Sequence, residues 1–153
     1  MALADDIDRL ARTRPFSLLP REAIQLIAFA AEKRMMAADE LLFEEGEPGD
    51  SGFFVLSGAI LLTAHGHAGE RTRVAAEGAL IGENAMIAEV QRPATARARE
   101  KSILLRIPRP VFRRVLGEYP RNAARIRADL QARTRKMTRE LDELRLRAIA
   151  PPK

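Results

Sequence analysis

The first clear pattern along the chain is helical. From residue 20 onward, apolar residues recur three and four positions apart, at Ile24, Ile27, Ala28 and Ala31. This spacing places them on one face of an α-helix. Pro20 suits a first helical turn, where its missing N–H costs no hydrogen bond. We therefore expect an amphipathic helix over residues 20–33.

After residue 33 the pattern changes to short apolar runs separated by polar turns. The runs read MMA, LLF, GFFVLSGAILLTA, TRVAA and ALI, and between them lie ADE, EEGEPGDSG, HGHAGER and EG. Two further runs, within ATARAREKSILLRIP, flank a polar turn at residues 100–102. Many short strands punctuated by Gly, Pro and Asp are typical of a β-sandwich or jelly roll. The middle of the chain is therefore predicted to be mainly β, with helices on both sides.

The last part of the chain returns to a helical pattern. Pro108 and Pro110 end the sheet region, VFRRVLGEY indicates a short helix, and residues 120–148 contain no Gly or Pro. Two apolar stripes follow the long segment at helical spacing: Tyr119, Ala123, Ile126 and Leu130, then Thr134, Met137, Leu141, Leu144 and Ala148. A helix of this length spans about 43 Å, which exceeds the width of a small domain. Its far end favours a partner helix, most simply in a homodimer, and a frayed tail is the alternative.

The composition limits the class of protein. A chain of 153 residues with 46% hydrophobic and 31% charged residues suffices for one domain with a core. No apolar run reaches the length of a membrane span, and the N-terminus MALADDIDRL carries acids where a secretory signal carries bases. The absence of cysteine excludes disulfides, thiolate metal sites and cysteine nucleophiles. We therefore expect a cytoplasmic protein.

The formal net charge of +5 is concentrated near the C-terminus. Residues 1–118 carry 16 basic and 17 acidic side chains, whereas residues 119–149 carry nine basic and four acidic ones. Such a helix either attracts nucleic acid or anionic lipid, or is a solvated face with local ion pairs. No groove-reading motif accompanies the arginines, so the solvated face is the favoured interpretation.

The stretch IGENAMIAEVQRPATARA contains the candidate chemistry. A short helical turn after Gly82 would offer free backbone N–H groups to an anion, and Arg92 has a planar fork of donors suited to phosphate. Glu83, when ionised, accepts hydrogen bonds from hydroxyl groups. A sugar hydroxyl close to a phosphate would satisfy both side chains at once. The alternative is a surface ion pair of Arg92 with Glu83 or Glu89.

The residues after Arg92 alternate small and polar side chains. If they form a strand, Ala94, Ala96 and Ala98 share one face, because successive side chains of a strand point to opposite sides. Three alanines beside an arginine would leave a hollow, which we expect to receive the ligand.

These motifs resemble the cyclic nucleotide-binding domain family. IGENAM and QRPATA are similar to the two halves of its phosphate-binding cassette, Phe-Gly-Glu-Leu-Ala-Leu and Pro-Arg-Ala-Ala-Thr-Val. The spacing from Glu83 to Arg92 is that of the kinase members. Upstream, FEEGEPGDSGFFVLSGAI resembles the family's Gly-x3-Asp, aromatic-strand and Gly signature, through Gly46, Asp50 and Gly58. The resemblance runs from about residue 15 to residue 135.

The resemblance implies a jelly-roll β-roll with N-terminal helices and a long C-terminal helix. It implies a regulatory, non-enzymatic module in which residues 1–118 hold the nucleotide and residues 119–150 form a lid or dimerisation helix. The hinge helix would cover residues 111–116. The implied ligand-binding residues are Gly82, Glu83, Asn84, Ala85, Arg92, Pro93 and Ala94. The cyclic phosphate would sit on Arg92 and the 82–85 backbone, and Glu83 would take the ribose 2′-hydroxyl. Arg121, Arg125 and Ile126 are candidates for covering the base.

Pro93 departs from the family pattern. Relatives often have Ala, Ser or Thr there, and a hydroxyl at this position is associated with guanine recognition. Its absence favours cyclic AMP over cyclic GMP. Proline also lacks the N–H that relatives use on the phosphate. One hydrogen bond to a charged group contributes about 1.5–3 kcal/mol, so binding weaker by about ten- to a hundredfold is expected.

The remaining polar residues are not predicted to form a metal site or a catalytic site. His65 and His67 are too few to hold a metal and are expected to be exposed in a β-turn. Glu44, Glu45, Glu47 and Asp50 lack EF-hand spacing and are expected to be solvated loop charges. No nucleophile motif supports catalysis.

Three alternative functions remain. They are a non-binding interaction module of the same fold, the effector part of a transcriptional regulator without its DNA-binding domain, and a nucleic-acid-binding protein that uses the arginine-rich helix.

Overall fold

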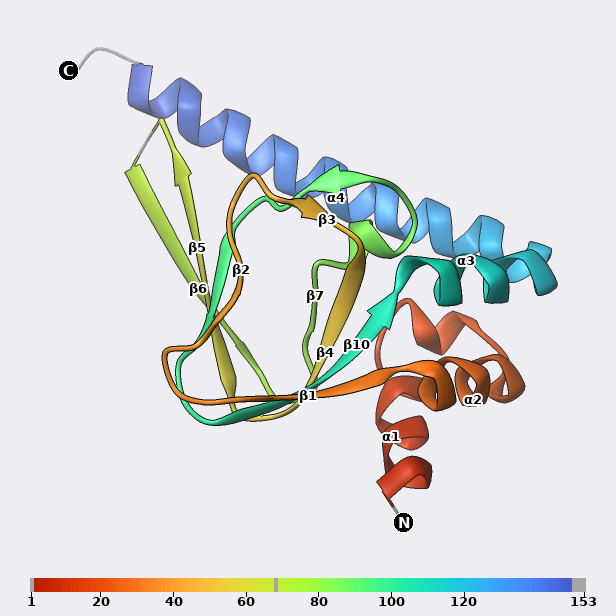
Figure 1. Cartoon of the computed structure of the whole chain (residues 1–153). Coiled ribbons are helices and arrows are strands. Elements are labelled where there is room, and N and C mark those ends of the chain that lie inside the picture. The colour runs from red at the N-terminus through yellow and green to blue at the C-terminus, as the bar shows by residue number, and fades with distance from the viewer. Residues whose placement is uncertain (1, 68, 150–153) are drawn as a thin grey trace.

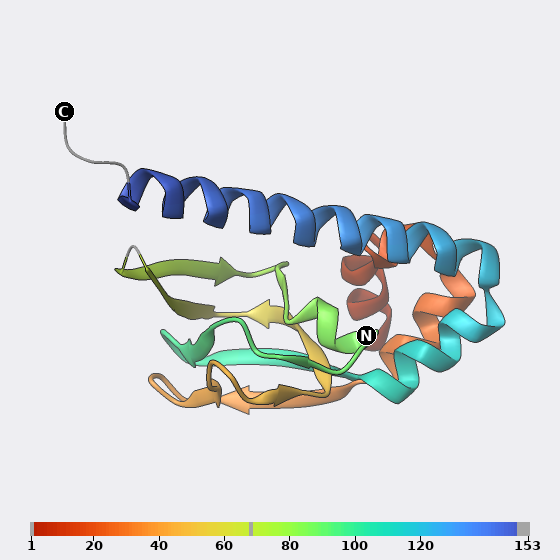
Figure 2. The same cartoon turned by 90° about the horizontal axis from the view of Figure 1, so that it is seen from above.

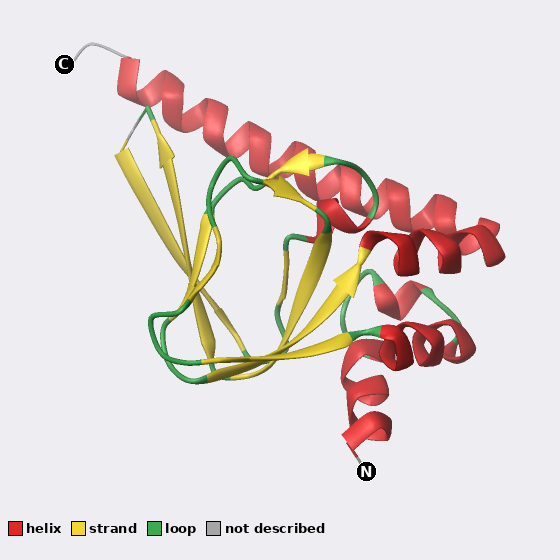
Figure 3. Cartoon of the chain, viewed as in Figure 1, coloured by secondary structure: helices red, strands yellow, loops and turns green. Residues whose placement is uncertain are grey.

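The computed structural model describes the backbone of residues 2–67 and 69–149, and within these ranges all side chains except those of residues 2, 134 and 136–149. The N-terminal helices gather at one end of a roll of strands, and the long last helix runs along one side of the roll (Figures 1 and 2). Strands make up the body between the helical parts (Figure 3). The predicted fold class, mainly β with flanking helices, is confirmed.

Three helical segments precede the sheets: α1 (Ala2–Ala11), the 3-10 helix η1 (Phe16–Leu18) and α2 (Arg21–Ala30). Ile24 and Ile27 are buried as their spacing predicted, but the predicted helix ends three residues early. Ala31 is already extended, and Glu32 begins a strand that pairs with β10 (Ser102–Pro108). Pairing with a neighbouring strand overrides the local helical spacing there.

The body is a jelly roll built from two four-stranded antiparallel sheets and one short strand pair. The strand orders are β1-β10-β4-β7, β2-β9-β5-β6 and β3-β8. The strands other than β10 are β1 (Glu32–Met36), β2 (Leu41–Phe43), β3 (Pro48–Gly49), β4 (Ser51–Ser57), β5 (Ala59–Gly66), β6 (Gly69–Ala76), β7 (Leu80–Ile81), β8 (Val90–Gln91) and β9 (Thr95–Ala98). The predicted β segments are therefore confirmed, and Gly58, at φ 90°, makes the turn from β4 to β5.

Two hydrophobic cores lie on the two faces of the first sheet. Successive residues of β4 alternate between them: Phe54 packs with the helices, whereas Phe53 and Val55 pack between the sheets. In β10, Leu105 joins the helical core and Leu104 the core between the sheets. The continuous apolar runs of these strands are thus explained by burial on both faces.

Two helices follow the last strand, α3 (Arg109–Glu118) and α4 (Pro120–Ile149). Ala123, Ile126 and Leu130 of the first α4 stripe are buried in the helical core, and Tyr119 packs against it. The second stripe lies outside the side chains that the structure describes. None of the described helices combines the length and the apolar character needed to cross a membrane.

Candidate functional site

The predicted cassette folds as a short helix between two short strands. Gly82 follows β7 in the left-handed conformation (φ 68°, ψ 28°), and the 3-10 helix η2 (Glu83–Met86) begins directly after it. A residue with a side chain rarely adopts this φ, so glycine is required at this turn. The Ala85 N–H donates to the Gly82 carbonyl at 3.1 Å and closes the turn. Glu83 is half-buried and Asn84 is exposed.

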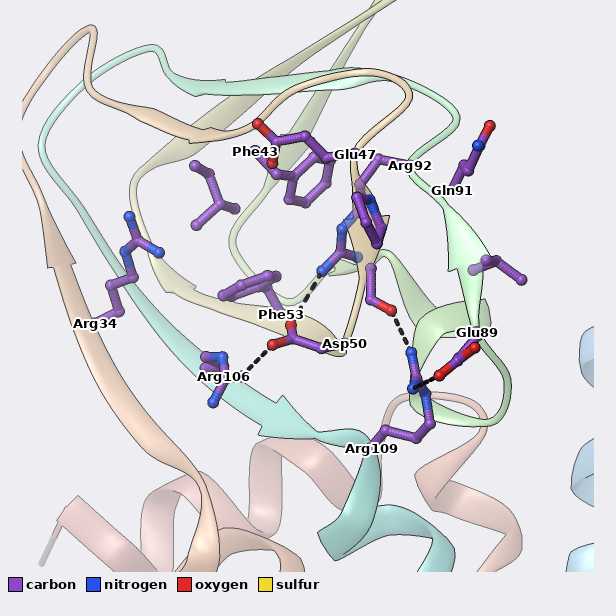
Figure 4. A pocket seen from close by; sticks show the side chains of 14 residues that line it. Arg34, Phe43, Glu47, Asp50, Phe53, Glu89, Gln91, Arg92, Arg106 and Arg109 are labelled. Carbon is purple, nitrogen blue, oxygen red and sulfur yellow. Dashed lines mark hydrogen bonds and ion pairs between the residues drawn. The ribbon is translucent and has the colours of Figure 1, made fainter.

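Arg92 enters the interior of the roll from the loop after β8. Its backbone N–H donates to the Glu47 carbonyl at 2.7 Å, and its carbonyl accepts from the Gly46 N–H at 2.8 Å. The residue is only 5% exposed. Its guanidinium carbon lies 4.2 Å from the centre of the Phe43 ring and 5.7 Å from that of Phe53 (Figure 4). The two aromatic faces thus hold a buried cation.

The Arg92 guanidinium fits only because two glycines lie beside it. A Cβ atom at Gly49 would stand 2.9 Å from Arg92 Nε, and one at Gly82 would overlap Arg92 Nη1. The guanidinium is therefore packed between β3 and the start of the cassette helix. Two backbone segments that are far apart in the sequence, at Gly49 and at Gly82, thus meet at the positive charge of Arg92.

This charge is poorly compensated within the described part of the chain. The nearest carboxylate is that of Asp50, whose Oδ1 lies 3.9 Å from Arg92 Nη2 and whose side chain is 70% exposed. Among the residues that the structure describes, Arg92 Nη1 is buried without a hydrogen-bond partner. Burial lowers the pKa of Arg92, and the attraction of Asp50 and Glu47 opposes this shift. Because arginine stays protonated in proteins, the result is an under-paired buried cation.

Asp50 is more than a solvated loop charge, which corrects the expectation from sequence. Its carboxylate accepts from Ser51 Oγ and from Arg106, each at 2.9 Å. Partial burial raises the pKa of Asp50, but these two hydrogen bonds and the charge of Arg106 outweigh it and leave the pKa below its ordinary value. Glu45 also differs from the expectation, because it pairs with His65, whereas Glu44 and Glu47 are exposed.

Arg109 is a site residue that the sequence analysis missed. It is the first residue of α3, and its Nε donates to the Ala85 carbonyl at 3.0 Å. Its Nη2 donates to the Gly49 carbonyl, and its backbone N–H donates to the Asp50 carbonyl at 2.8 Å. One side chain therefore ties the cassette helix to β3. The only sequence signal was an arginine next to the strand-ending prolines, which local pattern alone does not distinguish from a surface charge.

A cavity of about 760 Å³ opens in front of Arg92 (Figure 4). Basic side chains from β1, β10 and α3 line it together with aromatic and acidic ones; among the labelled residues are Arg34, Phe43, Glu47, Asp50, Phe53, Glu89, Gln91, Arg92, Arg106 and Arg109. Of the seven predicted site residues, only Arg92 lines this cavity. The Gly82–Ala85 turn meets the guanidinium from another side, as the Gly82 geometry shows.

The sequence predicted that three alanines share one strand face and leave a hollow there, but this face is packed into the core. Ala96 and Ala98 do share one face of β9, but both are buried in the core between the sheets. Ala94 packs against the same core, and Pro93 is exposed.

The proposed surface ion pair of Arg92 with Glu83 or Glu89 is wrong, because Arg92 is buried beside Asp50. Glu89 instead lies 4.0 Å from Arg109.

Comparison with known proteins decides the family. The cyclic nucleotide-binding domain profile matches residues 33–119, which include the whole cassette. The chain belongs to this family.

Solved relatives have the same fold. A cyclic nucleotide-binding-like protein from Brucella abortus is 36% identical, with a TM-score of 0.66, covering 74% of this chain and 98% of that one. The catabolite activator protein of Thermus thermophilus is 28% identical, with a TM-score of 0.71, covering 89% of this chain and 62% of that one. The resemblance stated from the motifs is thereby confirmed.

A curated relative is much longer than this chain. The lysophospholipase nte1 of Aspergillus oryzae is 32% identical over 106 residues, which are 68% of this chain but 7% of that enzyme. The shared part thus corresponds to a small piece of the enzyme. The match lies in the cyclic nucleotide-binding domain, which is a regulatory module. The lysophospholipase activity is that of the whole, longer enzyme.

Within this cyclic nucleotide-binding domain, the three candidates for covering the base differ in accessibility. Ile126 is fully buried in the helical core, so it reaches a ligand only if α4 moves. Arg121 and Arg125 are exposed on α4.

The two histidines are exposed, as the sequence predicted. The side chain of His65, at the end of β5, is 66% exposed, and His67 is exposed as well.

Proposed function

We propose that the chain binds a 3′,5′-cyclic nucleotide, with cyclic AMP preferred, and acts as a regulatory module rather than as an enzyme. One observation carries the proposal. Arg92 is a buried cation whose Nη1 has no hydrogen-bond partner among the described residues and whose nearest carboxylate is 3.9 Å away and largely exposed. A buried, unpaired donor is costly unless a ligand satisfies it. A phosphate is a ligand that a guanidinium recognises through paired, charge-assisted hydrogen bonds.

The roles of the cassette residues follow from their positions. The backbone of Gly82, Glu83, Asn84 and Ala85 would bind the phosphate together with Arg92, because the turn at Gly82 lies directly against the guanidinium. The half-buried carboxylate of Glu83 would accept from the ribose 2′-hydroxyl. Pro93 and Ala94 would line the far side of the phosphate, where Pro93 supplies neither a hydroxyl for guanine nor an N–H for the phosphate.

Regulation would run from the cassette to the C-terminal helices. Arg109, the first residue of α3, holds the Ala85 carbonyl, and α3 packs against both η2 and α4. A ligand that shifts η2 would therefore shift α3 as well. We propose residues 1–118 as the nucleotide-binding unit and residues 119–150 as the lid or dimerisation helix, with a second copy or an unidentified protein as the partner.

The test is calorimetric titration of the purified protein with cyclic AMP and cyclic GMP, after removal of bound nucleotide. We expect binding with cyclic AMP preferred. Arg92→Ala should weaken it by about 2–5 kcal/mol, because the buried phosphate loses its charged partner. Arg99→Ala is the matched control, since Arg99 is exposed just after β9. Unchanged affinity in Arg92→Ala would disprove the role of Arg92.

The second candidate function is an interaction module that binds no nucleotide. Two observations favour it: Pro93 offers the phosphate no N–H, and the Arg92 guanidinium already stacks on Phe43 at 4.2 Å. Thermal denaturation discriminates between the two functions, because only a protein that binds nucleotide is stabilised by it through mass action. No shift with either nucleotide at millimolar concentration would favour the interaction module.

A further inference from the structure

The carboxylate of Asp50 lies between two guanidinium groups. Arg106 Nη2 is 2.9 Å from Asp50 Oδ2, whereas Arg92 Nη2 is 3.9 Å from Asp50 Oδ1 (Figure 4). The first distance is that of a charge-assisted hydrogen bond, and the second exceeds hydrogen-bond range. Ser51 Oγ also donates to Oδ1, on the side that faces Arg92. Asp50 is thus shared unequally, in favour of Arg106.

Arg106 is itself held from two sides. It sits in the central strand β10, directly opposite Glu32 of β1 and Phe53 of β4. Its Nη1 bonds the Glu32 carboxylate at 2.8 Å while its Nη2 bonds Asp50. The guanidinium is held by Glu32 of β1 and by Asp50, which lies between β3 and β4, so its position does not depend on Asp50 alone.

The unequal sharing matters for the charge of Arg92. A carboxylate that bonded Arg92 directly would compete with an incoming phosphate for the same donors. In its present place, the Asp50 carboxylate accepts one hydrogen bond from Arg106 and one from Ser51, and none from Arg92. Arg92 Nη2 therefore makes no hydrogen bond to Asp50, and among the described residues Nη1 is buried without a partner, so both nitrogens are available to a ligand.

We propose that Arg106 is a positioning residue that holds Asp50 off Arg92 and so keeps Arg92 available to the phosphate of the ligand. This inference rests on the proposed function, in which Arg92 binds that phosphate. This role is separate from the place of Arg106 in the cavity lining. Arg106 acts through Asp50.

The binding test uses the full chain and calorimetric titration with cyclic AMP. Arg106→Met frees Asp50 to move onto Arg92 and should weaken binding by about three- to fivefold, the upper end of the scale of one partly exposed ion pair. Asp50→Asn in the Arg106→Met background should restore affinity to within about twofold of the wild type, because no carboxylate is left to compete. Arg106→Lys, which keeps a cation beside Asp50, should stay within about twofold too.

A control outside the cavity separates this effect from loss of charge. Arg21 of α2 pairs with Asp8 at 2.9 Å and does not line the cavity. Arg21→Met removes the same charge and should change affinity by less than about twofold. The inference is overturned if Arg21→Met and Arg106→Met weaken binding equally, or if Asp50→Asn fails to rescue Arg106→Met.

A ligand-free measurement keeps the two proposals apart. If the wild-type protein binds neither cyclic nucleotide, the proposed function fails, and urea unfolding then tests the positioning alone. The coupling between Asp50 and Arg92, from a double-mutant cycle, should be larger in the Arg106→Met background than in the wild-type background. Equal coupling in the two backgrounds would show that Arg106 does not position Asp50.

Discussion

Replacing Arg92 with methionine is expected to abolish nucleotide binding without destabilising the ligand-free protein. Methionine keeps the length of the side chain and can fill the space between Phe43 and Phe53. It removes a cation that is 5% exposed and that has no full counter-ion. If Arg92 lowers the stability of the ligand-free protein, a binding function explains why the residue is present, and a purely structural role does not.

The magnitude follows from the contacts of the guanidinium. The change loses a cation–π contact worth about 0.5–2 kcal/mol, and the 3.9 Å pair with exposed Asp50 adds at most about 1 kcal/mol. It gains sulfur–aromatic contacts of about 0.3–1.5 kcal/mol and removes an unsatisfied buried donor that costs about 1–3 kcal/mol. The losses come to about 0.5–3 kcal/mol and the gains to about 1.3–4.5 kcal/mol, so the central values leave about 1 kcal/mol in favour of the variant.

Thermal denaturation of the nucleotide-free proteins measures this balance. In a chain of this size 1 kcal/mol shifts Tm by about 2–4 °C, so Arg92→Met should melt between the wild-type Tm and about 8 °C above it. Arg99→Met, at an exposed position after β9, is the control and should change stability by less than about 0.5 kcal/mol. A fall of more than about 5 °C in Arg92→Met alone would refute the argument, because it would make Arg92 a structural residue.

Three further changes test separate features of the site and its surroundings. Gly82→Ala, at φ 68° and against the Arg92 guanidinium, should destabilise the protein by about 1–2 kcal/mol in urea unfolding, whereas Gly117→Ala, in open space on α3, should stabilise it by about 0.5–1 kcal/mol. Pro93→Ala restores an N–H and should tighten cyclic AMP binding in calorimetry by about tenfold or more; unchanged or weaker binding would show that this N–H does not meet the phosphate. The hydrogen bond to Glu45 raises the pKa of His65, so the stability it contributes is full below the unfolded pKa and is lost as pH rises through the folded one. His65→Gln should therefore lower Tm more at pH 5.5 than at pH 8.5, and an equal loss at both would contradict the pairing.

The sequence predicted those parts of the fold that local pattern determines. The alternation in β9, the helical stripe at Ala123, Ile126 and Leu130, and the turn at Gly82 all depend on neighbours within a few residues. The ordered cassette motifs added the family, and with it the topology. The end of α2 was mispredicted, because Glu32 is drawn into a strand by pairing with Arg106, 74 residues away in sequence.

The surroundings of Arg92 were not predictable in the same way. The sequence identified the arginine, and the ion pair that it offered as the alternative to ligand binding was with Glu83 or Glu89. Its actual carboxylate neighbour, Asp50, is brought there by β3 and β4, and the competing Arg106 by the register of β10 against β4. Which charge pairs with which depends on strand register, and a shift of one residue would turn Arg106 to the other face of the sheet.

Arg109 shows why these long-range contacts matter for signalling. Its side chain holds carbonyls of the cassette helix and of β3, and its backbone N–H holds the carbonyl of Asp50. The first turn of α3 is thus bonded to the three segments that surround the Arg92 guanidinium. A ligand changes a conformational equilibrium only by as much as its affinities for the two states differ. A phosphate drawn to Arg92 would bear on the cassette helix and on the Asp50 carboxylate at once. Arg109 links both groups to α3, so we expect ligand affinity to depend on the position of the C-terminal helices even without a contact between the nucleotide and α4.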